Sequence, residues 1–131
     1  MPWQLHYVAE QDFIDSELFG QLTAAELTEG VATGLQEGNA RGTSRYLCDA
    51  SRLTGGHSIF DLYALAERLH DMGMPFGARE ALVIPRQPIQ ALDASFWETL
   101  CRNRGFEVRS FLDRETALAW LLREEGARTG T

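Results

Sequence analysis

The chain has 131 residues, a formal net charge of -7, 44% hydrophobic residues and 24% charged residues. This length suits one domain that buries a single core, and the composition is ordinary for a globular protein. The negative charge argues against nucleic acid as a partner, because phosphate binding requires a basic surface.

The N-terminal residues and the two cysteines indicate the cellular compartment of the protein. Residues 1–6 have neither the basic nor the apolar part of a signal peptide, and no apolar run is long enough to cross a bilayer. Cys48 lies in a segment whose hydropathy is typical of a core strand, and Cys101 lies in a segment typical of a helix. We therefore expect a cytoplasmic protein without a transmembrane segment, in which both thiols are reduced and buried.

The chain begins with a pattern typical of two strands. Apolar and polar residues alternate from Trp3 to Tyr7, and again over residues 13–20 after a short polar turn. A short connection favours an antiparallel hairpin. The acidic residues Asp15 and Glu17 share one face of the second strand, which suits a sheet edge or a solvated side.

The first helix is predicted at about residues 24–37. Thr23 and Glu26 have the spacing of a capping box, in which each side chain binds the backbone amide of the other residue. Gly38 and Asn39 supply the stop. The apolar stripe of this helix consists of Leu27, Val31 and Leu35.

The middle of the chain predicts a strand, a Gly-rich loop, a helix and another strand. The third strand covers Arg45–Asp49, and the loop that follows opens a helix at Ile59. Gly73 and the following Met-Pro end this helix. Residues 81–84 form a continuous apolar run, which suits a strand covered on both faces.

The last third predicts a helix capped by Asp93 and closed by Gly105, a fifth strand that begins at Phe106, and a final helix capped by Asp113. Residues 125–131 have nothing to bury and are expected to fray. The element order is therefore β-β-α-β-α-β-α-β-α over a domain of residues 1–124. Alternating strands and helices imply an α/β fold with a mixed, mostly parallel five-stranded sheet and helices packed against it.

Four short segments carry a resemblance to a known family: Phe19–Thr23, Leu47–Asp49, Phe111–Asp113 and Ala117–Leu121. With the element order, they make the chain resemble the STAS domain, the fold of the bacterial anti-sigma-factor antagonists. More specifically, it resembles the uncharacterised SpoIIAA-like family, also called STAS/SEC14-like. The match spans nearly the whole chain up to the tail, and its motifs are mostly structural.

The resemblance implies a regulatory site at Ser58. In the antagonists, a partner kinase phosphorylates a Ser in an Asp-Ser-Ser-Gly turn at the start of the second helix. Ser58 falls on that position, while the surrounding Asp, Ser and Gly are replaced. From the residues themselves, Ser58 with Asp61 three positions later also predicts a helix cap, and a phosphate there would face the positive helix end.

The loop before Ser58 offers candidate ligand-binding groups. Thr54, Gly55 and Gly56 could present backbone amides to an anion, although paired glycines more often serve a turn that requires positive φ. Ligands of open α/β sheets gather beyond the carboxyl ends of parallel strands. Arg86 belongs at that edge, where it would meet an anionic ligand or pair with Asp49 or Asp113.

Catalytic and metal sites are not expected. Asp49, His57 and Ser58 include the residue types of a hydrolase triad, but His57 and Ser58 are chain neighbours and the chain lacks a nucleophile elbow. A catalytic thiolate at Cys48 is disfavoured because the predicted strand buries it. The ligand spacings typical of zinc sites are absent from the sequence, and no cofactor is expected.

Two functions remain open. The first is a non-enzymatic regulatory or protein-interaction module that uses the surface around Thr54, His57 and Ser58, either with a protein partner or as a homodimer. The second is a carrier that binds a small apolar or acyl ligand between the helices and the sheet, which the SEC14-like part of the resemblance implies. Phe60 and Tyr63 would flank its cleft or pack in the core, and with Trp97 they would also suit a dimer interface.

Overall fold

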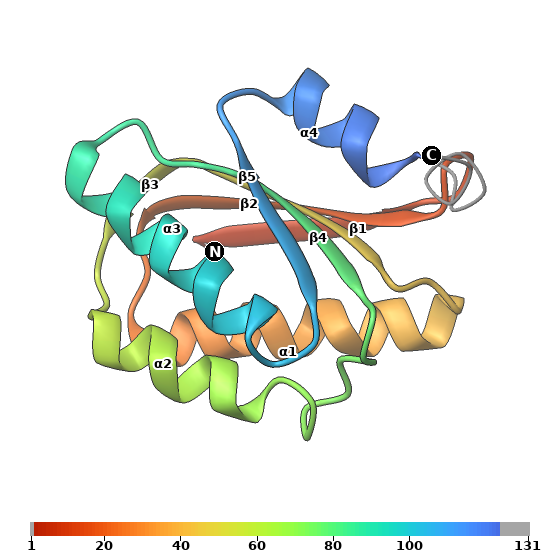
Figure 1. Cartoon of the computed structure of the whole chain (residues 1–131), viewed down its shortest axis with the longest axis horizontal. Helices are drawn as coiled ribbons and strands as arrows, with labels where there is room; N and C mark the ends of the chain where they lie inside the picture. The colour runs from red at the N-terminus through yellow and green to blue at the C-terminus, as the bar shows by residue number, and fades with distance from the viewer. Residues whose placement is uncertain (1, 124–131) are drawn as a thin grey trace.

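The computed structural model describes residues 2–123, and within them the helices and strands follow the order predicted from the sequence (Figure 1). The strands are β1 (Trp3–Val8), β2 (Phe13–Gln21), β3 (Arg45–Gly55), β4 (Arg79–Val83) and β5 (Glu107–Phe111). The helices are α1 (Ala24–Arg41), α2 (Ile59–Arg68), α3 (Pro88–Arg102) and α4 (Arg114–Leu121). None of these helices is long and apolar enough to cross a membrane. The expected tail, residues 125–131, lies outside the described residues.

The strands form one mixed sheet in the order β1-β2-β3-β4-β5. β1 pairs with β2 in antiparallel fashion, as expected from the short turn between them. The pairs β2–β3, β3–β4 and β4–β5 are parallel, and a helix connects the two strands of each pair. The prediction of an α/β fold with a mixed, mostly parallel sheet is therefore confirmed.

Helices cover both faces of the sheet. α1, α2 and α3 lie on one face, and α4 lies on the other (Figure 1). The layer under α4 consists of Phe13, Leu47, Ala81, Val83, Ala117 and Leu121. The layer under α1–α3 is larger and includes Leu22, Leu53, Leu62, Leu65, Leu82 and Leu100. β4 contributes to both layers because successive side chains point to opposite faces, which explains its continuous apolar run.

The predicted helix caps of α1, α2 and α4 are confirmed. Thr23 Oγ1 accepts from the Glu26 amide at 3.1 Å, and Glu26 Oε1 accepts from the Thr23 amide at 2.9 Å. Ser58 and Asp61 form the same reciprocal pair, at 3.1 and 2.8 Å. Asp113 caps α4 by accepting from the backbone amide three residues later at 2.8 Å. Each side chain satisfies an amide that the first helical turn leaves without a partner.

The predicted end of α1 is wrong by one turn. The helix continues through Gly38 and Asn39 and ends at Gly42, whose φ of 75° is left-handed. Gly38 is instead a packing residue, since a Cβ there would lie 2.4 Å from Tyr46 Oη. A glycine that admits a neighbouring side chain looks the same in the sequence as a glycine that stops a helix.

Four further boundaries differ from the prediction. α2 ends at Arg68, five residues before Gly73, and β4 covers Arg79–Val83 instead of residues 81–84. β3 runs to Gly55, so most of the expected loop after Asp49 is strand, because the second half of the long β2 pairs with it. α3 begins at Pro88 rather than at Asp93, because proline at the first helical position needs no amide partner and its φ suits a helix. Asp93 therefore lies inside α3.

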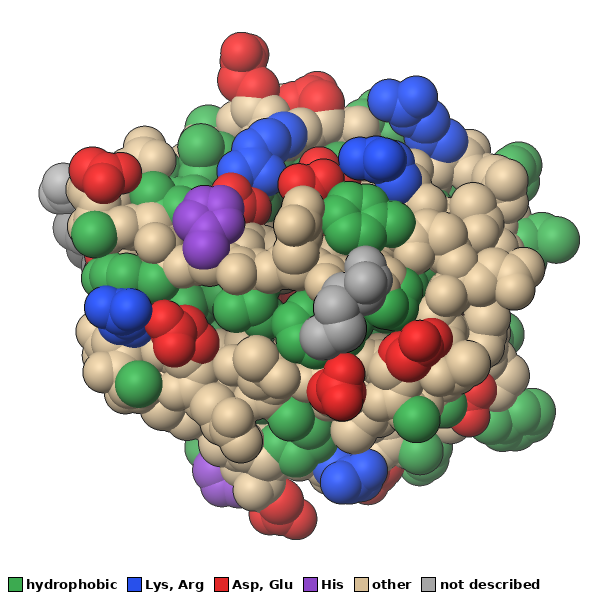
Figure 2. Space-filling model, turned by 180° about the vertical axis from the view of Figure 1, so that it is seen from behind, with side chains coloured by type: hydrophobic (Ala, Val, Ile, Leu, Met, Phe, Trp, Pro, Cys, Tyr) green, Lys and Arg blue, Asp and Glu red, His purple; other side chains and the backbone are tan. Residues whose placement is uncertain are grey.

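The acidic face of β2 is not an exposed edge. β2 lies between β1 and β3, and Asp15 is buried there at 9% exposure. Arg114, at the start of α4, donates from both terminal nitrogens to the two carboxylate oxygens of Asp15. The sequence pattern could not reveal this pairing because the two residues are 99 positions apart. Over the face drawn in Figure 2, acidic and basic side chains are interspersed.

Candidate ligand-binding site

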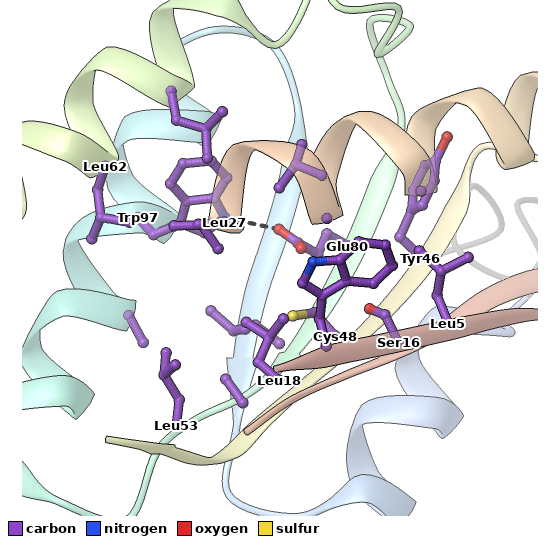
Figure 3. A pocket seen from close by; sticks show the side chains of 18 of the residues that line it. Leu5, Ser16, Leu18, Leu27, Tyr46, Cys48, Leu53, Leu62, Glu80 and Trp97 are labelled. Atoms are coloured by element: carbon purple, nitrogen blue, oxygen red, sulfur yellow. Dashed lines mark hydrogen bonds between the residues drawn. The ribbon is translucent and has the colours of Figure 1, made fainter. Parts of the chain in front are cut away.

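A cavity of about 140 Å³ lies between the sheet and helices α1, α2 and α3. Its apolar lining includes Trp3, Leu5, Leu18, Leu27, Val31, Leu53, Leu62, Leu65, Leu82 and Trp97. Its polar lining includes Ser16, Cys48, His57, Glu80, Gln90 and Asp93. Figure 3 shows side chains from the sheet and from the helices converging on this space.

The floor of the cavity follows from the alternation along the strands. Ser16 of β2 stands beside Cys48 of β3, and Tyr46 of β3 stands beside Glu80 of β4. These side chains share the face of the sheet that α1–α3 cover, because residues two apart on a strand point the same way. The floor is thus a row of mixed polar and apolar groups instead of a uniform aliphatic layer.

The face of α1 that meets the sheet carries three glycines spaced four residues apart, and two of them, Gly30 and Gly34, line the cavity. Gly30, Gly34 and Gly38 lie on the helix face that meets the sheet. A Cβ at Gly30 would lie 3.2 Å from Trp3 Cγ, and one at Gly34 would lie 3.7 Å from Leu5 Cδ2. The glycines let these large strand side chains approach the helix backbone. This spacing is visible in the sequence beside the apolar stripe, and it was the available signal for the close approach of α1 to the sheet.

Glu80 is the residue of the sheet that brings a carboxyl group into the cavity lining. Figure 3 shows its carboxyl group among the lining side chains, with Trp97 Nε1 donating to Oε1 at 2.9 Å. The side chain is half-buried and belongs to the lining of the cavity. Burial raises the pKa of Glu80 above the ordinary glutamate value, and the Trp97 hydrogen bond opposes this in part.

Sequence reasoning missed Glu80 because it treated residues 79 and 80 as a polar boundary of an apolar strand. Both residues belong to β4. Arg79 is buried on the α4 side, where Nη1 donates to the Leu121 carbonyl at 3.1 Å. Glu80 shares its face with Leu82, and that spacing was the available signal for a carboxyl group inside the domain.

Some of the other polar groups at the cavity have hydrogen-bond partners and others do not. Trp3 Nε1 and Tyr46 Oη are buried, and neither has a hydrogen-bond partner among the described residues. The Tyr46 hydroxyl lies against Gly38, whereas Ser16 Oγ donates to the Leu47 carbonyl at 3.0 Å. Burial raises the pKa of the Cys48 thiol, and the nearby Glu80 adds to this, so the neutral thiol is favoured.

One end of the cavity reaches the carboxyl edge of the parallel strands. His57 follows β3, Pro85 follows β4, and the half-buried Gln90 and Asp93 lie in the first turns of α3. His57 Nδ1 lies 2.9 Å from the Leu22 carbonyl, which fixes the ring at this end. The location agrees with the rule that places ligands of open α/β sheets at this edge.

The glycine loop has a structural use. Gly55 and Gly56 both have positive φ, at 124° and 103°. A Cβ on Gly56 would lie 2.4 Å from the Leu22 carbonyl oxygen, and the Leu22 amide donates to the Gly55 carbonyl at 2.9 Å. The loop therefore joins the end of β2 by direct backbone contact. The neighbouring Thr54 is exposed and ends the run of β3 side chains.

The remaining predicted site residues do not form one cluster. Asp49 Oδ1 accepts from the Ser51 hydroxyl at 2.7 Å, and Ser58 Oγ accepts from a backbone amide as the cap of α2. Arg86 is exposed, and within residues 2–123 it pairs with neither Asp49 nor Asp113. No three His, Cys, Asp or Glu side chains of the described chain lie together in a way that could hold a metal ion.

The start of α2 is apolar but does not belong to the cavity. Phe60 is 84% exposed, and Ile59 and Tyr63 are each 48% exposed. The sequence-based expectation that Phe60 and Tyr63 pack in the core or flank a cleft is therefore wrong. Leu62 and Leu65 form the buried face of this helix instead, while Trp97 of α3 lines the cavity.

Comparison with solved structures identifies the fold. The chain is similar to an uncharacterised protein from the DUF3478 family with a SpoIIAA-like fold, from Shewanella loihica PV-4, with a TM-score of 0.59. The two sequences are 22% identical, and the match covers 91% of each chain. The protein has the SpoIIAA-like fold that the sequence motifs predicted. No protein-family model and no curated protein matches the chain.

Proposed function

We propose that this protein is a non-enzymatic carrier that binds a small, mainly apolar molecule in the cavity between the sheet and α1–α3. The observation that supports it is the cavity itself, with about 140 Å³ of space inside a domain of 131 residues. Protein interiors are close-packed, and voids larger than a water molecule are few. A space of this size, lined mostly by apolar side chains, has the character of a binding site.

The size limits the ligand. An engineered core cavity of roughly 150 Å³ lined by aliphatic side chains stays dry and binds benzene. The cavity here is close to that value, so its volume suits an aromatic ring or a short acyl chain. Longer chains would have to leave through the end lined by His57, Gln90 and Asp93.

The test is a native mass spectrum of the protein purified from its own host, compared with a variant whose cavity is filled. Val31 lines the cavity on α1, and Val31→Phe adds a ring to that space. Gln36→Phe adds the same ring at an exposed position of the same helix. We expect a bound small-molecule mass on the wild type and on Gln36→Phe, and its loss from Val31→Phe. If the natural protein carries no such mass and takes up no apolar probe, the carrier function is wrong.

We propose a regulatory interaction as the second candidate. It is supported by the exposed apolar residues Ile59, Phe60 and Tyr63 directly after Ser58, because large exposed aromatic groups are typical of interaction surfaces. A phosphate on Ser58 would compete with its capping role and would alter the start of α2. An intact mass one phosphate heavier, lost in Ser58→Ala, would support this switch, and a doubled native mass would indicate a homodimer. Unmodified, monomeric protein from the host would contradict both.

A further inference from the structure

Two buried polar atoms at the cavity, Trp3 Nε1 and Tyr46 Oη, have no hydrogen-bond partner among the described residues. Trp3 Nε1 is a donor only, and it is buried without a partner. Glu80 Oε1 already accepts from Trp97, and Ser16 directs its hydroxyl hydrogen away to the Leu47 carbonyl. An unpaired buried donor is costly, so a ligand that supplies an acceptor gains binding free energy here.

The charges around the cavity disfavour an anionic ligand. Among the described residues that line it, neither Arg nor Lys is present, and the carboxyl groups are those of Glu80 and Asp93. A ligand carboxylate or phosphate would enter an apolar site without a counter-charge, which is unfavourable. The acceptor that suits the site is therefore uncharged.

The protonation state of Glu80 also favours an uncharged ligand that accepts a hydrogen bond. Burial raises the pKa of this carboxyl group and favours the neutral acid. Oε1 then remains the acceptor for Trp97, and the protonated Oε2 is a donor that protein does not use among the described residues. In this protonation state Glu80 and Trp3 each present a donor at a cavity whose lining is mostly apolar.

We propose that the cavity selects uncharged ligands whose apolar body carries a hydrogen-bond-accepting oxygen, such as a carbonyl or ether, placed against Glu80 and Trp3 Nε1. This inference rests on the proposed carrier function, and it adds the chemical class of the ligand. Hydrocarbons are expected to bind more weakly, because they leave both donors unpaired. Amine cations are also expected to bind more weakly, because they would require an ionised Glu80.

Four probe molecules with one aromatic ring test this inference by titration calorimetry or by NMR. Acetophenone and α-methylstyrene have the same shape and differ in a carbonyl oxygen against a methylene group. The α-methylbenzylamine cation and benzoate add the two charged alternatives. Because a ketone is also better solvated in water, the quantity to compare is the ratio of the acetophenone to the α-methylstyrene dissociation constant, measured in each variant.

Glu80→Leu removes the donor, and Glu80→Gln keeps an acceptor for Trp97 and an amide donor for the ligand. We expect Glu80→Leu to shift the ratio about fivefold against the ketone, from the worth of one hydrogen bond. Glu80→Gln should leave it within about twofold, and Trp3→Phe should shift it in the same direction as Glu80→Leu. Gln36→Phe, a change at an exposed position of α1 outside the cavity, is the control.

The outcomes separate this inference from the carrier function. An unchanged ratio in Glu80→Leu, or tighter binding of the amine cation than of acetophenone by the wild type, overturns the donor-site inference and leaves the carrier function in place. Binding of none of the four probes argues against the carrier function itself. If Glu80→Leu does not fold, the wild-type ranking of ketone against amine and the Trp3→Phe ratio decide the question.

Discussion

Glu80→Gln should stabilise the protein near neutral pH. In the unfolded chain Glu80 ionises with an ordinary pKa of about 4.3. In the folded protein burial raises its pKa, so the native state holds a proton that the unfolded state has lost. Stability must then fall as the pH rises from the ordinary value through the raised one. A glutamine cannot ionise, and it still accepts the hydrogen bond from Trp97.

The size of the effect follows from linkage. Each pKa unit between the folded and unfolded states of one group is worth about 1.4 kcal/mol. Mutational data put the cost of a buried polar group without full compensation at about 1–3 kcal/mol, and we expect a gain in this range at about pH 8. Below about pH 4 the wild-type carboxyl group is neutral in both states. The variant and the wild type should converge there.

Urea denaturation of both proteins at about pH 4, 6 and 8 measures this difference directly. The groups that share the Glu80 environment are Tyr46, Cys48 and Cys101, whose pKa values its charge raises further. These groups titrate above this pH range, so they do not contribute to the pH dependence of the difference in unfolding free energy. A difference in unfolding free energy that is constant with pH, or a variant less stable than the wild type at pH 8, would refute a neutral, buried Glu80.

Three further changes test the packing. Gly38→Ala should lose about 1–2 kcal/mol of unfolding free energy, because overpacking against Tyr46 Oη at 2.4 Å exceeds the gain in helix propensity, and Tyr46→Phe should recover part of it. Equal losses in both backgrounds would contradict this. Gly56→Ala should cost more than about 3 kcal/mol, since it adds left-handed strain to a clash with Leu22; a normal melting temperature would disprove it. Ser58→Ala should cost about 1 kcal/mol in the same urea assay, and no loss would exclude the cap.

The features predicted well from the sequence are those that neighbouring residues determine. A capping box needs only residues three apart, so Thr23 and Ser58 could be identified as caps directly. The order of strands and helices follows from periodicity, which is also local. The misplaced starts and ends arise where one residue type has two uses. Gly38 packs against a side chain instead of ending α1, and Asp93 lies within α3 instead of capping it.

A ligand site between the helices and the sheet was one of the two predictions, but the residues that line the cavity depend on contacts between distant positions and were not predicted. Trp97 donates a hydrogen bond to Glu80, 17 positions away in the sequence, and Trp3 of β1 packs against Gly30 of α1. Hydropathy also misled the expectation for α2, where Phe60 is 84% exposed. Hydrophobic residues remain common on protein surfaces, so an aromatic side chain on a helix does not reveal which side it faces. Polar residues inside strands deserve the same weight as apolar residues on helices.

Glu80 is hard to explain as a structural residue alone. A leucine at this position would fill part of the space and remove the cost of burying a carboxyl group, while the hydrogen bond to Trp97 returns only part of that cost. Natural proteins retain such destabilising groups chiefly where function requires them. A structural role predicts that every change at Glu80 weakens the fold. The ligand role predicts opposite effects: Glu80→Leu loses the preference for the ketone, whereas Glu80→Gln keeps it and gains stability above the ordinary glutamate pKa.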